Sequence, residues 1–484
     1  MTKLSVQIGT ALALCAVSSL AFATQVIAER IARVESGLRG PNAIKGQLSG
    51  ARIADRMAAL NVPGVSVAVI NKGVIEWARG YGVAEAAGTR QITPETLFQA
   101  ASISKPVAAF AALALVEKGT LALDGDVNTQ LTTWKVPAGA QSPAAPVTLR
   151  RLLNNSAGTT VSGFRGYARG EPLPTLPQLL DGVKPANSDP VRVQTTPGVE
   201  WKYSGGGFSI AQHLMTDASG KPFATLMHDT VLAPLGMTNS TFEQPLPPAL
   251  HAVSASGHTD KGQPVQGQWH TYPEQAAAGL WTTPSDLARF AIALQDAIAG
   301  RSNKIVSKAM TAQMLTRLKG NYGLGLFVGE IEGQQVFQHG GHNEGFRTMM
   351  VAFTRSGQGA VVMTNGERGD ALAAQIIRGI AAVYGWNDWQ ATEKILAKSA
   401  LKNYGSYEGN YQLNGKPISV TRERERLFIS AANFGLDRVE LFPTSSTRFF
   451  NLNDEVEFFF EKKGNGKFDM VIQLDRPLRA TRVM

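Results

Sequence analysis

Residues 98–105, Phe98-Gln99-Ala100-Ala101-Ser102-Ile103-Ser104-Lys105, stand directly before an Ala- and Leu-rich run at 106–118. That composition predicts a buried helix, and Gly119 is a typical residue at a helix end. Ser102 and Lys105 are three residues apart at the helix start, so they share one face. The partial positive charge of a helix N-terminus favours negative charge on the serine oxygen. A lysine amine kept partly neutral by burial could accept the serine proton. The stretch therefore predicts a nucleophilic serine with a lysine base beside it.

The Ser-x-x-Lys pattern occurs twice, so the pattern alone does not identify the nucleophile. The second copy is Ser399-Ala400-Leu401-Lys402. It lies in a polar stretch, where a solvated serine and lysine are expected. A lysine one turn into a buried helix is out of place unless it has a chemical role, and Lys105 has one next to Ser102. We therefore assign the nucleophile to Ser102.

The first 23 residues have the pattern of a secretory signal peptide. Lys3 precedes a mostly apolar run at 8–20, and Ala21-Phe22-Ala23 offers small residues where a signal peptidase cleaves. A retained N-terminal anchor is the alternative, but the run is shorter than the about 20 residues that span a bilayer. We expect a periplasmic or secreted protein with no stable membrane span after cleavage.

Composition excludes several classes of site. Cys15 is the only cysteine among 484 residues, so cleavage after residue 23 leaves no disulfide, no cysteine nucleophile and no thiolate metal site. The formal net charge of +9 is spread along the chain without a basic run, which argues against nucleic acid as a partner. His339 and His342 have no third ligand at helical spacing, so we expect no metal. No pattern indicates an oligomeric state.

After residue 23, the sequence has two parts that differ in their pattern of predicted helices and strands. Up to about residue 390, helical and strand patterns mix: a helix at 52–60, a hairpin at 65–80, strands at 335–338, 347–354 and 360–364, and a helix at 285–299 that Ser285 caps and Gly300 ends. After residue 402, short strand-like runs are separated by Gly, Asn, Asp and Pro, which is typical of a small barrel or sandwich. These runs are 407–413, 418–422, 427–431, 438–442, 448–451, 455–462 and 468–474. We expect a domain at 24–390, a linker at 391–402 and a β domain at 403–484.

Further motifs follow the helix start in order. They are Gly119-Thr120-Leu121-Ala122-Leu123-Asp124, the segment 147–158, Pro197-Gly198-Val199-Glu200-Trp201-Lys202-Tyr203-Ser204-Gly205, Pro234-Leu235-Gly236-Met237 and the segment 278–287. Together with Ser102-Ile103-Ser104-Lys105, they resemble class C β-lactamases and their esterase and peptidase relatives over residues 45–385. The resemblance implies an α+β fold of the β-lactamase/transpeptidase type: an antiparallel sheet flanked by helices, a helical region, and Ser102 in the cleft between them. The C-terminal part resembles the small lipocalin-like barrel that follows this domain in several relatives.

The family's Tyr-x-Asn motif corresponds to Tyr203-Ser204-Gly205, so the tyrosine is present and the asparagine is Gly205. By resemblance, Tyr203 shares the general-base role with Lys105 and later helps to protonate the leaving group. A phenol can act as a base only where a cation stabilises its phenolate, and Lys105 is the available cation.

The family's Lys-Thr-Gly strand motif corresponds to His339-Gly340-Gly341, a form seen in many peptidase and esterase relatives. Glycines here would let a substrate lie against the strand edge as an added strand. The resemblance also places the oxyanion hole at the backbone N–H groups of Ser102 and His342.

The resemblance implies a serine hydrolase that forms an ester intermediate on Ser102 without a metal or organic cofactor. Its substrate would be a small ester, amide or peptide, including one with a D-residue. A β-lactamase or DD-peptidase is an alternative, as is a non-catalytic sensor that binds cell-wall peptides or penicillin. Gly205 lacks the amide that the family's asparagine offers to β-lactams, and His339 replaces a cationic lysine. We therefore expect a poor β-lactamase and a better esterase or small-amide hydrolase.

Overall fold

The computed structural model describes residues 24–47, 50–397, 404–434, 436–464, 466–474 and 476–483. Contacts divide the described chain into two compact units, one of residues 24–29 and 54–377, and one formed by the described residues of 30–53 and 378–483. The expected signal peptide at 1–23 and the second Ser-x-x-Lys copy at 399–402 lie outside the described residues. The expected domain boundaries at 390 and 402 stay predictions.

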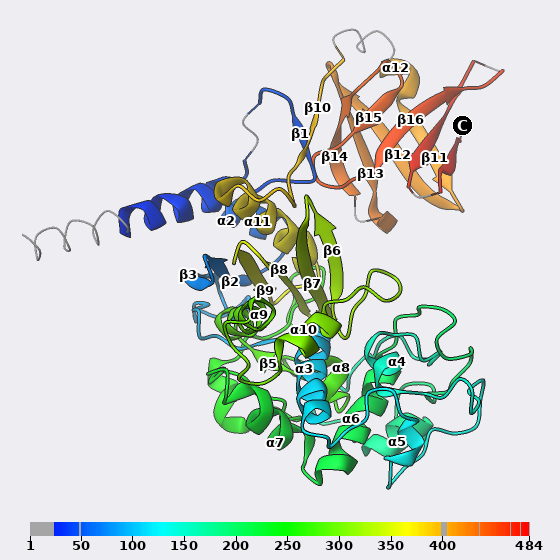
Figure 1. The fold of residues 1–484 in the computed structure, drawn as a ribbon. Coiled ribbons are helices and arrows are strands. Elements are labelled where there is room, and N and C mark those ends of the chain that lie inside the picture. Colours follow the sequence, from blue (N-terminus) through cyan, green and yellow to red (C-terminus); the bar gives the residue numbers. More distant parts are fainter. Residues whose placement is uncertain are drawn as a thin grey trace, which may run out of the picture. The chain divides into compact units, whose positions relative to one another are not determined.

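A six-stranded antiparallel sheet forms the centre of the first unit, with strand order β3–β2–β9–β8–β7–β6 (Figure 1). All eight residues of β2 are buried between its two neighbours, which explains its apolar sequence. The expected hairpin and the three expected late strands are confirmed. The strands are β2 (Gly64–Asn71), β3 (Val74–Gly82), β6 (Phe327–Ile331), β7 (Gln334–Asn343), β8 (Phe346–Phe353) and β9 (Gly359–Thr364).

Helices cover the sheet and form a separate helical region of the same unit. Helix α9 packs against β2 and β9, while α3 packs against α6 and α8 in the helical region (Figure 1). Helix α3 is buried around most of its surface, as its Ala-rich sequence predicts. The helices are α2 (Ile53–Ala59), α3 (Ser104–Glu117), α4 (Leu149–Leu153), α5 (Leu176–Asp181), α6 (Gly205–Ser219), α7 (Phe223–Met227), α8 (Gln275–Ala278), α9 (Pro284–Ala299), α10 (Lys308–Met314) and α11 (Gly369–Tyr384). Short 3₁₀ segments are η1 (Ala101–Ile103), η2 (Val127–Thr129) and η4 (Pro248–Val253), and η3 (His228–Leu232) is a short π-helical segment.

The expected cap of α9 was wrong by two residues. The N-cap is Thr283, whose side chain accepts a hydrogen bond from the backbone N–H of Asp286. Pro284 then occupies the first helical position, where its missing N–H costs nothing. Ser285 lies inside the first turn. Gly300 ends the helix in the left-handed conformation, as expected.

The C-terminal β domain is a closed eight-stranded barrel in which β11 pairs with β18. The expected α+β architecture, an antiparallel sheet flanked by helices with a helical region and followed by a small all-β barrel, is therefore confirmed. Sequence patterns missed β18, because only one of its five side chains, Ala480, is buried. Residues 404–407 form a helical turn, α12 (Tyr404–Tyr407), before the first strand. The strands are β11 (Gly409–Leu413), β12 (Lys416–Glu423), β13 (Arg426–Ala431), β14 (Leu436–Pro443), β15 (Arg448–Phe450), β16 (Glu457–Lys462), β17 (Phe468–Gln473) and β18 (Leu478–Arg482), with η6 (Ala432–Phe434) after β13.

A short parallel pair, β1 (Asn42–Ile44) and β10 (Thr392–Lys394), belongs to the same unit as the barrel. Strand β10 lies within the segment expected to be a linker. Within the described ranges, no helix is both long and apolar enough to cross a membrane.

Candidate active site

Ser102 lies where the chain turns sharply from strand β4 (Phe98–Gln99) into helix α3. Strand β4 pairs with β5 (Trp281–Thr282), and the one-turn segment η1 follows. Ala101 has a φ of +50°, a left-handed conformation that is costly for a residue with a Cβ atom. Ala101 is fully buried, whereas Ser102 is partly exposed. The turn therefore presents the serine hydroxyl to solvent at the start of a buried helix.

Lys105 is buried beside the serine, with 2% of its surface exposed. Its Nζ donates hydrogen bonds to Ser102 Oγ at 3.0 Å and to the backbone oxygen of Ala277, in helix α8, at 2.8 Å. Burial lowers the pKa of Lys105 to about 7. A substantial fraction of the amine is therefore neutral at physiological pH and can accept a proton from Ser102.

Tyr203 completes a cluster of three groups. Its hydroxyl hydrogen-bonds with Ser102, and its ring centroid lies 5.0 Å from Lys105 Nζ. Burial raises the pKa of Tyr203 to about 12, and the hydrogen bond with Ser102 opposes that rise only in part. The resting phenol is thus neutral despite the neighbouring amine, which favours proton transfer through Tyr203 over storage of a phenolate.

The segment that carries Tyr203 is anchored by Asn155. The backbone oxygen of Asn155 accepts from the N–H of Lys202 at 2.9 Å, and its Oδ1 accepts from the N–H of Ser204 at 3.0 Å. The Ser204 hydroxyl then caps helix α6 by accepting from the N–H of Gly207. Asn155 therefore fixes the backbone on both sides of Tyr203, which restrains the position of its phenol.

His339 lies on strand β7 with 2% of its surface exposed. Its Nδ1 lies 2.6 Å from the backbone oxygen of Gly340, and its Nε2 lies 3.0 Å from the hydroxyl of Tyr322. Burial, aided by Lys105, lowers the pKa of His339 to about 3, so the ring is neutral. A carbonyl oxygen can only accept, so Nδ1 carries the proton and the Tyr322 hydroxyl donates to Nε2.

Gly341 lets strand β7 approach the nucleophile's segment. A Cβ on Gly341 would lie 2.2 Å from the backbone oxygen of Ala100 and 3.1 Å from Ala101 Cβ. A Cβ on Gly340 would meet only Thr348 O, at 3.7 Å. The space at Gly341 is therefore taken by the protein itself, which differs from the expectation that its glycine makes room for substrate. Gly340 is the glycine with open space.

The edge of β7 next to this approach is not paired by β6 in the described chain. In the described chain, the pairing of β6 with β7 extends to Phe327 opposite Gln338 and no further. His342 is exposed on the following part of β7. Gly341 packs against Ala100 and Ala101, which directly precede Ser102, and His342 directly follows Gly341. The structure thus brings together the two segments whose N–H groups were predicted to form an oxyanion hole.

Gly205 opens helix α6 and faces an aromatic side chain. A Cβ at Gly205 would lie 2.9 Å from Phe164 Cε2. The loop that carries Phe164 is fastened to the helix start, because the N–H of Gly205 donates to Ser162 O and that of Gly206 donates to Val161 O. An apolar ring therefore lies where a side chain at position 205 would extend.

Sequence reasoning missed Tyr322, Phe164 and Glu274. The only local signal for Tyr322 was the pair Gly323 and Gly325 beside it, which marks a tight turn. Glu274 is fully buried before α8, and neither carboxyl oxygen has a hydrogen-bond partner on another residue in the described chain. Burial raises the pKa of Glu274 to about 8.

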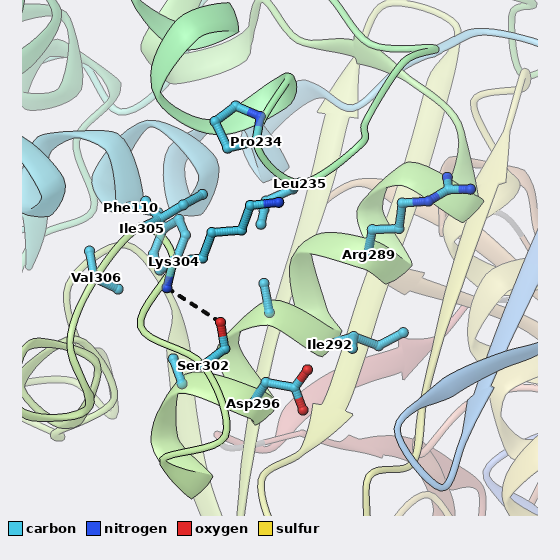
Figure 2. A pocket seen from close by; sticks show the side chains of 12 residues that line it. Phe110, Pro234, Leu235, Arg289, Ile292, Asp296, Ser302, Lys304, Ile305 and Val306 are labelled. Atoms are coloured by element: carbon cyan, nitrogen blue, oxygen red, sulfur yellow. Dashed lines mark hydrogen bonds between the residues drawn. The ribbon is translucent and has the colours of Figure 1, made fainter.

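A separate pocket of about 250 Å³ lies elsewhere in the same unit (Figure 2). Phe110, Leu235, Arg289 and Lys304 are among its lining residues, and the Ser102 cluster contributes none. Figure 2 shows Lys304 and Ser302 on the loop that follows α9, where the backbone N–H of Lys304 donates to the Ser302 hydroxyl. We therefore do not assign this pocket to the Ser102 chemistry. Among the described residues, no group of three His, Cys, Asp or Glu could hold a metal ion.

Comparison with known proteins adds independent information. The family model described as Beta-lactamase matches residues 51–384. Penicillin-binding protein 4* of Bacillus subtilis (strain 168) is 25% identical over 417 residues, which cover 80% of this chain and 88% of that protein. Esterase EstB of Burkholderia gladioli is 28% identical, over 46% of this chain and 58% of the esterase. D-aminopeptidase of Gluconobacter oxydans (strain 621H) is 23% identical, over 71% of this chain and 63% of the aminopeptidase. The octameric penicillin-binding protein homologue from Pyrococcus abyssi shares the fold, with a TM-score of 0.60, 22% identity, and coverage of 89% of this chain and 98% of that one.

Proposed function

The chain belongs to the β-lactamase family, and on that premise we propose that it is a serine hydrolase that works through an acyl-enzyme on Ser102. Its relatives include penicillin-binding proteins, an esterase and a D-aminopeptidase. The observation that carries the proposal is the buried Lys105 amine, 3.0 Å from Ser102 Oγ, with a pKa of about 7. Ligand binding alone does not require a lysine that is about half neutral near pH 7 and hydrogen-bonded to a serine hydroxyl.

Acylation begins with transfer of the Ser102 proton to neutral Lys105, while Oγ attacks the carbonyl carbon of the substrate. Negative charge then develops on the carbonyl oxygen, which the N–H groups of Ser102 and His342 stabilise. Tyr203 is a neutral phenol that relays a proton from Lys105 to the leaving group. It donates its own proton to the leaving group and receives one from the Lys105 ammonium. The resting state of Lys105 is restored, and Ser102 carries the acyl group as an ester.

Deacylation uses the same groups in reverse. Water attacks the ester, and its proton passes to the Lys105–Tyr203 pair as Ser102 leaves as the alcohol. No step needs an oxidant, a metal or an organic cofactor, because every proton has a donor and an acceptor among Ser102, Lys105, Tyr203 and water.

We assign the substrate to small esters and small amides, ahead of β-lactams. At Gly205, the family's asparagine amide is replaced by the Phe164 ring, which cannot bond to an acylamino group. At His339, the family's lysine is replaced by a neutral imidazole already engaged by Tyr322, which offers no charge to a β-lactam carboxylate. An ester without either group loses nothing at these positions.

A fluorophosphonate probe tests the nucleophile. Wild type should become labelled on one peptide that contains Ser102, and p-nitrophenyl butyrate should be hydrolysed. Ser102→Ala should abolish labelling and turnover with little change in melting temperature, because the side chain is partly exposed. The matched control is Ser399→Ala in the second Ser-x-x-Lys copy, which should keep both. Labelling that survives Ser102→Ala would refute the assignment.

We further propose that the protein acts in the periplasm or outside the cell, from the signal-peptide pattern of residues 1–23. N-terminal sequencing of the protein recovered from the periplasm or medium should begin at or near residue 24. An intact N-terminus in the membrane fraction would favour the retained anchor.

A further inference from the structure

The interior of the C-terminal barrel is filled differently at its two ends. At one end, the ring of Tyr407 stacks on Phe460 with centroids 4.2 Å apart, and Tyr411 and Phe449 pack around Phe460 at 6.0 and 5.6 Å. Tyr407 belongs to the helical turn α12, which precedes the first strand. Aromatic rings therefore close this end.

The other end encloses a cavity of about 310 Å³. This volume falls at the lower end of small-molecule sites, about 300–1,000 Å³. Closed eight-stranded barrels are wide enough to hold one small ligand where side chains leave space. The wall is formed by inward-facing aliphatic and aromatic side chains, among them Leu413, Ile418, Ile429, Phe458, Ile472 and Leu478.

Two apolar side chains lie both on the cavity wall and on the outer surface. Phe434 is 43% exposed and Leu474 is 45% exposed. Both follow the ends of strands, in the connections after β13 and β17. A wall residue that is also exposed marks an opening, so these two side chains define the mouth of the cavity.

Asp454 is the only charged residue among the described residues of the wall. Its Oδ1 accepts hydrogen bonds from Asn451 Nδ2 at 2.7 Å and from the N–H of Val456 at 3.0 Å. No donor in the described chain reaches Oδ2. An occupant of the cavity can therefore place a hydrogen-bond donor on Oδ2, whereas a second carboxylate there would be repelled.

A cation stands at the mouth. Lys416 Nζ lies 5.6 Å from the ring centroid of Phe434. The ligand's polar end thus meets an acceptor carboxylate on the wall and an ammonium at the rim. A carboxylate end group is repelled by Asp454 on the wall, and an ammonium is attracted by Asp454 but repelled by Lys416 at the rim, so a hydroxyl is the donor that meets no repulsion.

We propose that the barrel binds an aliphatic alcohol, with its hydrocarbon chain in the cavity and its hydroxyl on Asp454. The test uses the full-length protein and N-phenyl-1-naphthylamine, an uncharged fluorescent probe of apolar sites, with 1-decanol, decylamine and decanoate as competitors below their micelle concentrations. The probe should bind once per chain. Decanol should displace it at a concentration at least tenfold below that of decanoate, and decylamine should fall between them.

Ala431→Phe is the decisive variant, because Ala431 is buried on the wall and the added ring fills the cavity. It should weaken probe binding at least tenfold. The matched control is Ile395→Phe, at a position 68% exposed in the same unit, which should leave binding unchanged. Asp454→Asn should remove the discrimination against decanoate. Leu474→Trp, at the exposed mouth, provides a second block should Ala431→Phe fail to fold.

Ser102→Ala separates this site from the hydrolytic one and should bind the probe like wild type. The proposal is overturned if folded Ala431→Phe or Leu474→Trp binds the probe normally, or if Ser102→Ala abolishes binding. Equal displacement by the three competitors, or binding only in the presence of phosphatidylcholine vesicles, would overturn it equally.

Discussion

Phe164 occupies the space into which a side chain at Gly205 would extend: a Cβ there would lie 2.9 Å from Phe164 Cε2 and 3.3 Å from Cδ2. Position 205 therefore cannot take the family's asparagine unless the Phe164 ring moves or is removed. This relationship decides how the substrate preference can be altered.

Gly205→Asn alone should lower the melting temperature, since overpacking costs typically 1–3 kcal/mol, and should not create β-lactamase activity. Phe164→Ala with Gly205→Asn should recover the stability and raise kcat/KM for a chromogenic cephalosporin about tenfold to hundredfold, the value of one satisfied buried amide. Phe164→Ala alone is the control. Wild-type turnover of the cephalosporin well above that of p-nitrophenyl butyrate would contradict this account.

The esterase activity should depend on the neutral form of Lys105. Its pKa of about 7 predicts that kcat/KM rises with pH and reaches half its maximum near pH 7, because protonated Lys105 cannot accept the serine proton. Tyr203, with a pKa of about 12, should cause no decline below pH 10. A profile that is flat between pH 6 and 8.5 would show that another group is the base.

Lys105 and Tyr203 should act as a unit. Lys105→Ala or Tyr203→Phe should each reduce kcat by several orders of magnitude, and the double variant should cost little more, as for other cooperating catalytic groups. The measurement is a double-mutant cycle on kcat. Losses that add on the logarithmic scale would mean that the two residues perform separate steps.

Gly341→Ala and Gly340→Ala form a matched pair on strand β7. The methyl group at Gly341 would collide with the backbone oxygen of Ala100, so we expect a large fall in both melting temperature and kcat. The methyl group at Gly340 meets no atom closer than 3.7 Å, so its variant should melt like wild type. Equal stability of the two variants would show that the close approach is not required.

Glu274→Gln should stabilise the protein in alkaline solution. The folded-state pKa of about 8 lies above the ordinary value of 4.5, so the folded form retains a proton that the unfolded form has lost. Stability is therefore lost as the pH rises from 4.5 through 8. The variant should melt like wild type near pH 4.5 and about 2–4 °C higher, or more, at pH 9. A difference in melting temperature that does not grow with pH would exclude an ionising Glu274 as its cause.

Local patterns predicted the parts of the site that depend on neighbours in sequence. Ser102 and Lys105 are three residues apart on a helix start, so their contact follows from helix geometry. The contact of His339 with Tyr322 does not, because it depends on how a turn and a strand pack. The neutral state of His339 was predictable from residue type, but its proton position needed the contact of Nδ1 with the backbone oxygen of Gly340.

The fold shows the same division. The apolar run of β2 and the barrel's alternating strands were visible in the sequence, while β18 was missed because only two of its five residues, Leu478 and Ala480, are apolar. The replacement of an amide by Phe164 was also beyond sequence patterns, since residues 164 and 205 meet only through the loop anchored at Ser162. The contact between residues 164 and 205 depends on packing between segments that are distant in the sequence.

The positive φ of Ala101 has a consequence for behaviour on heating. This conformation is maintained by burial and by the close contact of β7 and Thr348 with Ala100, rather than by any preference of alanine itself. Slight loosening of these neighbours lets the residue relax and carries the serine out of line with its base, while the rest of the chain keeps its structure. Thermal inactivation should therefore precede melting, and cooling before aggregation should restore the enzyme.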